Sequence, residues 1–364
     1  MTLFLPGPGE PNDVDGVNDL FDGDDQRVAR RRGSRVLRAS LVLAIVIAIV
    51  VPGGAVAYGI FHQRITDQLA VWQYTPTAEV AQMAADSGMN DEGRFYFYAS
   101  APTVESAADF SSVCGSSTDD FVLLGCYTGS SIHVFNVTDA RLAGVRNVTA
   151  AHEMLHAVYA RLSDDDRTSL DALLEAQYQQ VKDDPDLAAR MKSYATSEPG
   201  ERDNELHSIF GTELASLSPN LEAHYTKYFS DRAKVVADNA AFQAVFTQVQ
   251  NQEKALAAQL TAAGDAVDSE STAYSAAMSA LNADIASFNT KADDGAFSSQ
   301  STFTAARNAL TARGDALTAR YQAIQADIAH YDDLRKQLEA VDSQASELNR
   351  SIDSSLQTPA PTAG

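Results

Sequence analysis

Basic residues are scarce in this sequence: 27 lysines and arginines stand against 49 aspartates and glutamates, a formal net charge of −22 over 364 residues. A nucleic-acid-binding protein needs a basic surface to replace the counterions along the phosphates. The composition therefore excludes nucleic acid as a partner. Glycine and proline, at 20 and 11 residues, are too few for a chain disordered throughout, and 45% of residues are hydrophobic. We expect a folded chain long enough for two domains.

Cysteine is nearly absent, with Cys114 and Cys126 as the only pair in the chain. Two cysteines this far apart do not form a zinc knuckle, so a metal site here needs other ligands. In an oxidising compartment the pair forms a disulfide that closes a short loop. The alternative is two free thiols.

Charged side chains are missing from residues 39–61, a run long enough to cross the roughly 30 Å hydrocarbon core as a helix. Six arginines precede it, and the positive-inside rule places them in the cytoplasm. The sequence predicts a single-pass plasma-membrane protein with a cytoplasmic N-terminus and an extracytoplasmic C-terminal domain. A cleaved signal peptide is the alternative, because it also has basic residues before an apolar core.

Composition and apolar period divide the chain into five segments. Residues 1–38 are rich in Gly, Pro and Asp and predict a disordered cytoplasmic tail, followed by the transmembrane helix over 39–61. Residues 62–234 predict a small sheet and packed helices, and residues 235–356 a coiled-coil hairpin. Residues 357–364 predict a disordered tail. The expected fold class is α+β, with one transmembrane helix and a long helical hairpin.

Several elements are expected inside residues 62–234. Strand-like runs, rich in aromatic and β-branched residues, cover 94–100, 121–127 and 131–137. Apolar residues then recur at helical spacing over 145–162, with Thr149 as a capping residue near the start. Proline and glycine punctuate the later helices, which are expected at 167–182, 185–195, 203–217 and 219–230.

A seven-residue apolar repeat begins at Leu310 and continues to Ile352, and a looser version covers about residues 242–288. Residues 289–300 between them contain Asp, Gly and Ser and predict a reversal. We expect an antiparallel hairpin of about 50 residues per arm. A parallel oligomeric coil of the last arm is the alternative. Either form offers a surface for self-association or for a partner.

The most specific motif is His152-Glu153-Met154-Leu155-His156. Residues four apart lie on one face of a helix, so the two imidazoles can bind the same metal ion. Glu153 points about a quarter-turn away and can act on a water molecule at the open metal position as general base. The sequence therefore predicts a catalytic Zn²⁺ site.

A catalytic zinc needs a third protein ligand. The metzincin extension is absent, because Tyr159 and Leu162 stand where that family has Gly and His. The run 202–213 is dense in ligand-type residues. Glutamates eight residues apart on a helix cannot both bind one ion. The candidates in that run are Glu205, Glu213 and His207.

With these two motifs, residues 90–230 resemble the gluzincin metallopeptidases, including their minimal members. Asn204-Glu205 is similar to the Asn-Glu that opens the second motif of thermolysin-like relatives. The resemblance implies a zincin-like domain over 62–234 and Glu205 as third ligand, ahead of Glu213 and His207. The sequence departs at Ile209, where those relatives have an aspartate that orients a histidine. The partner of the metal-binding histidines is therefore unassigned.

The resemblance also suggests where transition-state and substrate contacts lie. Such enzymes use a downstream Tyr or His as stabiliser, and they align substrate along an edge strand before the motif helix. We expect residues 131–137 to form that strand and His133 to be structural. The stabiliser candidates are His224, Tyr225 and Tyr228.

These features together predict an extracytoplasmic, membrane-anchored zinc metallopeptidase whose substrate is a protein or peptide. A zinc amidase acting on another substrate, such as a cell-wall peptide, uses the same chemistry. The alternative class is a membrane-tethered coiled-coil scaffold with a structural or vestigial metal site, since about a third of the chain is the hairpin.

Overall fold

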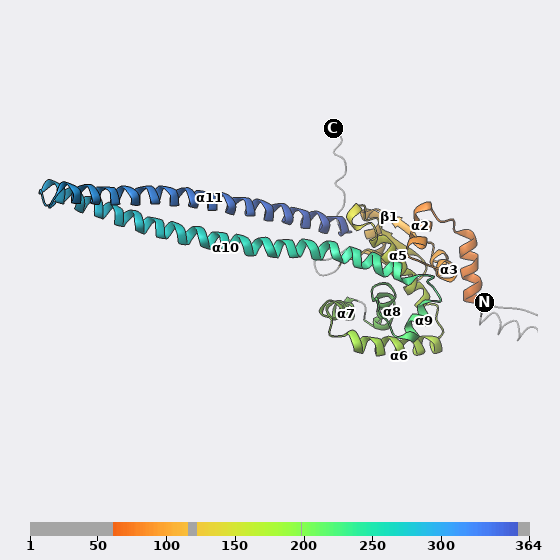
Figure 1. Cartoon of the computed structure of the whole chain (residues 1–364). Helices are drawn as coiled ribbons and strands as arrows, with labels where there is room; N and C mark the ends of the chain where they lie inside the picture. The colour runs from red at the N-terminus through yellow and green to blue at the C-terminus, as the bar shows by residue number, and fades with distance from the viewer. Residues whose placement is uncertain (1–60, 116–121, 198, 356–364) are drawn as a thin grey trace, which may run out of the picture. The chain divides into compact units, whose positions relative to one another are not determined.

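The computed structural model describes residues 61–115, 122–197 and 199–355 (Figure 1). The chain divides into two compact units, Met1–Arg64 and Ile65–Gly364. In the first unit the described residues, 61–64, are helical. All further structural statements concern the second unit.

The membrane prediction is not supported. Residues 39–60 of the expected transmembrane helix lie outside the described residues, as do the two predicted tails, 1–38 and 357–364. Among the helices that the structure describes, none combines the length and apolar character needed to cross a membrane. The single-pass plasma-membrane placement is therefore corrected.

The expected α+β class is also corrected, because helices make up 77% of the described residues. The described sheet has three short strands in the order β1-β3-β2: β1 (Thr103–Glu105), β2 (Gly125–Tyr127) and β3 (Ile132–Phe135). β1 pairs with β3 in parallel, and β2 pairs with β3 antiparallel.

One predicted strand, residues 94–100, is a helix. It belongs to α3 (Asp91–Ala99), whose N-cap Asn90 accepts hydrogen bonds from the backbone N–H groups of Glu92 and Gly93. Phe97 is fully buried and Gly93 lies one turn before it. The cap and the four-residue spacing outweigh the strand propensity of the aromatic residues, which is a context-dependent preference.

The motif helix α5 (Val145–Tyr159) lies at the centre of the main core, with twelve of its fifteen residues buried. It packs against α8 (Arg202–Thr212), α2 (Ala78–Asp86), α3 and the strands β2 and β3. Thr149 does not cap it, because α5 starts four residues earlier and the Thr149 hydroxyl donates to the Val145 carbonyl.

The later helices lie close to the predicted ranges, although two of them end early. Ser163 caps the first of these helices by accepting from the Asp166 backbone N–H, and Pro219 begins the last. Four of the described elements before α5 were not predicted: α2, β1, α4 (Ala107–Cys114) and the 3₁₀ turn η1 (Ala140–Leu142). The later helices are α6 (Asp164–Val181), α7 (Pro185–Ser197), α8 and α9 (Pro219–Tyr225).

Two long helices, α10 (Arg232–Asp293) and α11 (Gln300–Ile352), run side by side as a hairpin (Figure 1). Ion pairs link the arms, including Arg320–Glu270 at 2.7 Å. The reversal is shorter than expected and has Gly295 at φ 65°, a conformation that favours glycine. Ser299 then opens α11 with a capping box. The antiparallel arrangement predicted from the repeat is present.

The hairpin base and the disulfide both adjoin the sheet. Val249 of α10 and Leu348 of α11 pack with Phe110 and Phe135 in a second hydrophobic cluster. Cys114, at the end of α4, forms the expected disulfide with Cys126 of β2. Strand β2 is therefore held covalently to α4.

Candidate metal centre

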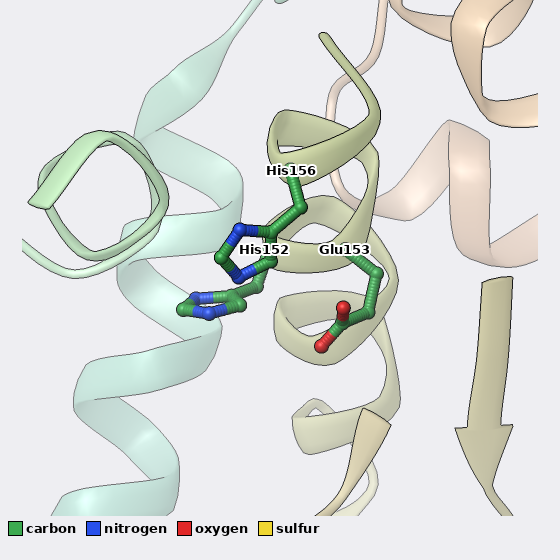
Figure 2. A group of neighbouring side chains, drawn as sticks. All are labelled: His152, Glu153 and His156. Carbon is green, nitrogen blue, oxygen red and sulfur yellow. The ribbon is translucent and has the colours of Figure 1, made fainter. Parts of the chain in front are cut away.

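Helix α5 places His152, Glu153 and His156 together. In Figure 2 the two imidazole rings project from the same side of the helix, and the Glu153 carboxylate leaves it in a different direction. One potential ligand atom from each residue lies within 4.8 Å of the others. The four-residue spacing produces this arrangement because it is close to one helical turn. These three side chains could hold a metal ion.

The Glu205 carboxylate reaches the same point from α8. Its oxygens lie 3.8 Å from Nε2 of His152 and 3.5 Å from Nε2 of His156. Zinc binds N and O ligands at about 2.0–2.2 Å, so neighbouring ligand atoms of a tetrahedral site lie about 3.4 Å apart. Glu205 is 3% exposed, so its carboxylate is enclosed beside the two imidazoles. The donor set therefore fits a tetrahedral divalent ion.

Asn204 is the hydrogen-bond partner of His156 that the sequence left unassigned. Its Oδ1 lies 2.9 Å from Nδ1 of His156 and can accept the ring proton, which directs the Nε2 lone pair toward Glu205. The Asn204 amide in turn donates to a Glu201 oxygen at 3.0 Å. The position at which the thermolysin-like relatives have an orienting aspartate is Ile209, and this side chain is fully buried in the core. The orienting group lies next to the ligand, in the same turn of α8.

Burial sets the protonation of the two histidines. It lowers the pKa of His152 well below the ordinary value, with further lowering from His156 and Arg190. It also lowers the pKa of His156, against the opposing effect of the Asn204 hydrogen bond. Both imidazoles are thus neutral at neutral pH, which is the form that binds a metal.

The other ligand candidates lie elsewhere. Glu213 is the C-cap residue of α8 and forms an ion pair with Arg190 at 2.6 Å. His207 is fully buried on another face of α8, with its Nε2 3.0 Å from Nε2 of His224. Of the three candidates, the structure brings only Glu205 to the two motif histidines.

The predicted stabilisers do not reach the site. His224 contacts His207, Tyr225 stacks on the His207 ring, and Tyr228 packs edge-on against Tyr96. All three are buried and belong to or adjoin the core behind α8. His133 is paired with Glu105 at 2.7 Å, in agreement with the expected structural role.

A cleft of about 380 Å³ opens over the motif. Tyr194 of α7 lines it, and burial raises the pKa of this hydroxyl, with a further contribution from Glu205, so it stays protonated. Tyr194 was not among the predicted site residues, because nothing in the α7 sequence distinguishes it as one. The remaining lining residues are Leu123, Gly125, Cys126, Tyr127, Gly129, His152, Glu153, His156, Ala160, Glu201, Asn204 and Glu205.

The prediction that residues 131–137 form an edge strand is wrong, because they contain β3, the central strand of the sheet. The edge strand that lines the cleft beside the motif is β2. Gly125 allows the close approach of β2 to α5. A Cβ at this position would lie 2.4 Å from Thr149 Cγ2 and 2.8 Å from Glu153 Oε1. The absence of a side chain at residue 125 therefore makes room for the Glu153 carboxylate.

Searches for similarity to protein-family models, curated proteins and solved structures found no match for this chain. The geometry of the site is therefore what indicates the function of this chain.

Proposed function

We propose that this chain is a zinc-dependent metallopeptidase of the gluzincin type that hydrolyses peptide bonds. The observation that carries the proposal is the convergence of His152, His156 and Glu205, with Glu153 beside them in an open cleft. Two helices supply these groups, as the resemblance implies.

The donor set favours zinc over harder ions. Two imidazoles and one carboxylate suit Zn²⁺, whereas Mg²⁺ and Ca²⁺ prefer oxygen ligands. When bound by His152, His156 and Glu205, zinc would supply Lewis acidity and make a water molecule acidic near neutral pH. Asn204 would hold His156 in the required tautomer.

Glu153 is the proposed general base. Its carboxylate accepts a proton from the water that attacks the peptide carbonyl carbon, so that a C–O bond forms. The same group delivers that proton to the amide nitrogen as the C–N bond breaks, and the second water proton follows from the new carboxyl group, so that a carboxylate and an ammonium product are released. Tyr194 lines the cleft, and its protonated hydroxyl is the proposed hydrogen-bond donor to the carbonyl oxygen as negative charge develops there.

Strand β2 is the proposed guide for the substrate backbone. Its three residues line the cleft, and among the described strands it pairs on one side only, with β3. An extended peptide can add to such an edge through main-chain hydrogen bonds. The disulfide at Cys126 fixes β2 in place for this pairing.

A scaffold built on the helical hairpin is the second proposal, with the metal site structural. It is favoured by the size of the hairpin, whose arms have 62 and 53 residues. The two proposals differ at Glu153, because a structural site does not need this carboxylate.

Zinc content per chain is the first test, measured on purified wild type and His152→Ala. We expect about one zinc per wild-type chain and none in the variant. A well-folded wild type without zinc after incubation with the metal would refute the proposed site.

Peptide cleavage with Glu153→Gln as the matched variant is the second test. We expect Glu153→Gln to retain zinc and to lose at least about 100-fold in kcat/KM, because the general base is removed. Equal cleavage by both proteins would remove Glu153 from the mechanism. Zinc binding without cleavage of any peptide by wild type would favour the scaffold.

A further inference from the structure

The two walls of the cleft differ in charge. Residues 122–138, which include β2 and β3, contain no charged side chain. On the helix side the cleft is lined by Tyr194 of α7 and by Glu201, Asn204 and Glu205 at the start of α8, and two of these residues are carboxylates. The cleft is therefore neutral on the strand side and acidic on the helix side.

The residues that line the cleft in the described chain include no lysine and no arginine. The carboxylates among them are Glu153, Glu201 and Glu205. A divalent ion at the proposed site balances two of these carboxylates. One negative charge remains, and it belongs to Glu201.

Glu201 is an exposed residue at the start of α8, beside the proposed metal ligands. Its hydrogen-bond donor is the neutral amide of Asn204. The nearby guanidinium groups are already engaged, with Arg190 paired to Glu213 and Arg202 paired to Glu175. The carboxylate of Glu201 is thus the charged group that a bound peptide meets on the helix side.

We infer that the cleft selects peptide segments carrying a lysine or arginine side chain, and that Glu201 is the specificity-determining residue. This inference rests on the proposed peptidase function. The peptide backbone lies along β2, and its basic side chain extends across the cleft to the Glu201 carboxylate. An acidic side chain in that position meets a like charge.

The size of the preference follows from the exposure of Glu201. An ion pair in contact with water changes affinity by about two- to fivefold. The net charge of −22 adds an attraction at longer range that speeds association with cationic peptides. Both effects weaken as salt is raised, because the Debye length falls from about 10 Å at 0.1 M to about 3 Å at 1 M.

The test uses the full chain, loaded with zinc, and two pools of N-acetylated hexapeptide amides. Both pools contain Ala, Ser, Leu and Phe at random, one with added Lys and Arg and the other with added Asp and Glu. Cleavage is followed by the appearance of new amino groups. Binding is measured with Glu153→Gln by the fluorescence anisotropy of pools that carry a neutral label. A third pool, uncharged in its side chains but with a free amino terminus, separates a terminal ammonium from a basic side chain.

We expect the Lys/Arg pool to bind and to be cleaved about three- to tenfold better than the Asp/Glu pool at low salt. Glu201→Gln, which keeps a hydrogen-bond acceptor for Asn204, should lower this ratio about two- to fivefold. Asp315→Asn removes the same charge from an exposed position of α11 and should leave the ratio nearly unchanged.

Equal use of the two charged pools, or a ratio that Glu201→Gln does not change, would overturn the inference. A preference for the pool with free amino termini over the Lys/Arg pool would overturn it as well, in favour of a terminal ammonium. Binding of the Lys/Arg pool without cleavage of any pool would support the charge preference while refuting the peptidase. The failures of the two proposals are thereby distinguished.

Discussion

Helix α5 and the hairpin arm α11 are both regular helices, but their residues serve different purposes. In α5, twelve of fifteen residues are buried, and two of these, Glu153 and His156, are polar groups of the proposed site. In α11, five of 53 residues are buried, all of them apolar. Burying ionisable groups lowers stability unless they gain partners. The comparison indicates that buried ionisable groups gather on α5, beside the proposed site, whereas the hairpin is long and largely exposed.

The region around α5 and the hairpin also differ in the expected effect of substitutions. Around α5, residues distant in sequence converge within a few ångströms, as with Glu205 and the two motif histidines. In the hairpin, most side chains face water and contacts repeat along the arms. Substitutions near α5 should therefore alter metal binding or chemistry, while those in the hairpin beyond its base should alter only helix stability.

The largest expected effect is the loss of a ligand. Glu205→Ala should weaken zinc binding by more than about 100-fold, because even outer-shell partners of a metal site contribute 10- to 100-fold. Glu213→Ala is the matched control and should retain zinc, since Glu213 is paired with Arg190 away from the histidines. Competition titration with a chromogenic chelator measures both affinities. Zinc loss in the control alone would transfer the ligand role to Glu213.

Gly125→Ala should give the next largest effect. The added methyl would lie 2.8 Å from Glu153 Oε1 and 2.4 Å from Thr149 Cγ2, so β2 or the carboxylate must move. A displacement of about 1 Å in a catalytic group can lower kcat/KM about 100-fold. We expect cleavage to fall by that order while zinc is retained. Full activity in Gly125→Ala would show that the Glu153 position seen here is not the one used in catalysis.

Acid should destabilise the core around the site more than the hairpin. Burial lowers the pKa of His224 to about 4 from an ordinary value of 6.5. The folded state thus binds this proton less readily than the unfolded state. The contribution of neutral His224 to the free energy of unfolding is complete above pH 6.5 and is lost as the pH falls through about 4, which amounts to about 3 kcal/mol.

Urea unfolding of the zinc-free chain between pH 7 and pH 4 measures this loss without interference from metal release. His224→Gln keeps a polar group beside His207 and should show a shallower pH dependence over the same range. An identical slope in wild type and variant would assign the acid sensitivity to other groups.

Features of the fold and of the site that arise from residues close in sequence could be predicted, whereas features that arise from contacts between distant residues could not. The motif cluster and the hairpin were predictable, because four-residue spacing and a sustained heptad repeat are local signals. The strand predicted for residues 94–100 is wrong, because the Asn90 cap favours a helix there and outweighs the strand propensity of the aromatic residues. Gly125 and Tyr194 could not be identified, since their importance arises from contacts with helices distant in sequence.

The smallest expected effect is a gain in stability from substitutions in the hairpin, away from the proposed site. At Gly314 of α11 a Cβ would meet no atom within 4 Å, so Gly314→Ala should raise the free energy of unfolding by about 0.5–1 kcal/mol through helix propensity. Gly264→Ala on α10 is the matched variant, and its Cβ would lie 3.4 Å from Tyr331 Cε2, so the gain should be smaller. Thermal unfolding followed by circular dichroism measures both.

Neither substitution should alter zinc affinity or cleavage, because no hairpin residue between Gly264 and Gly314 lines the cleft. A change in cleavage by either variant would mean that the hairpin is coupled to the site and that the two regions do not act separately.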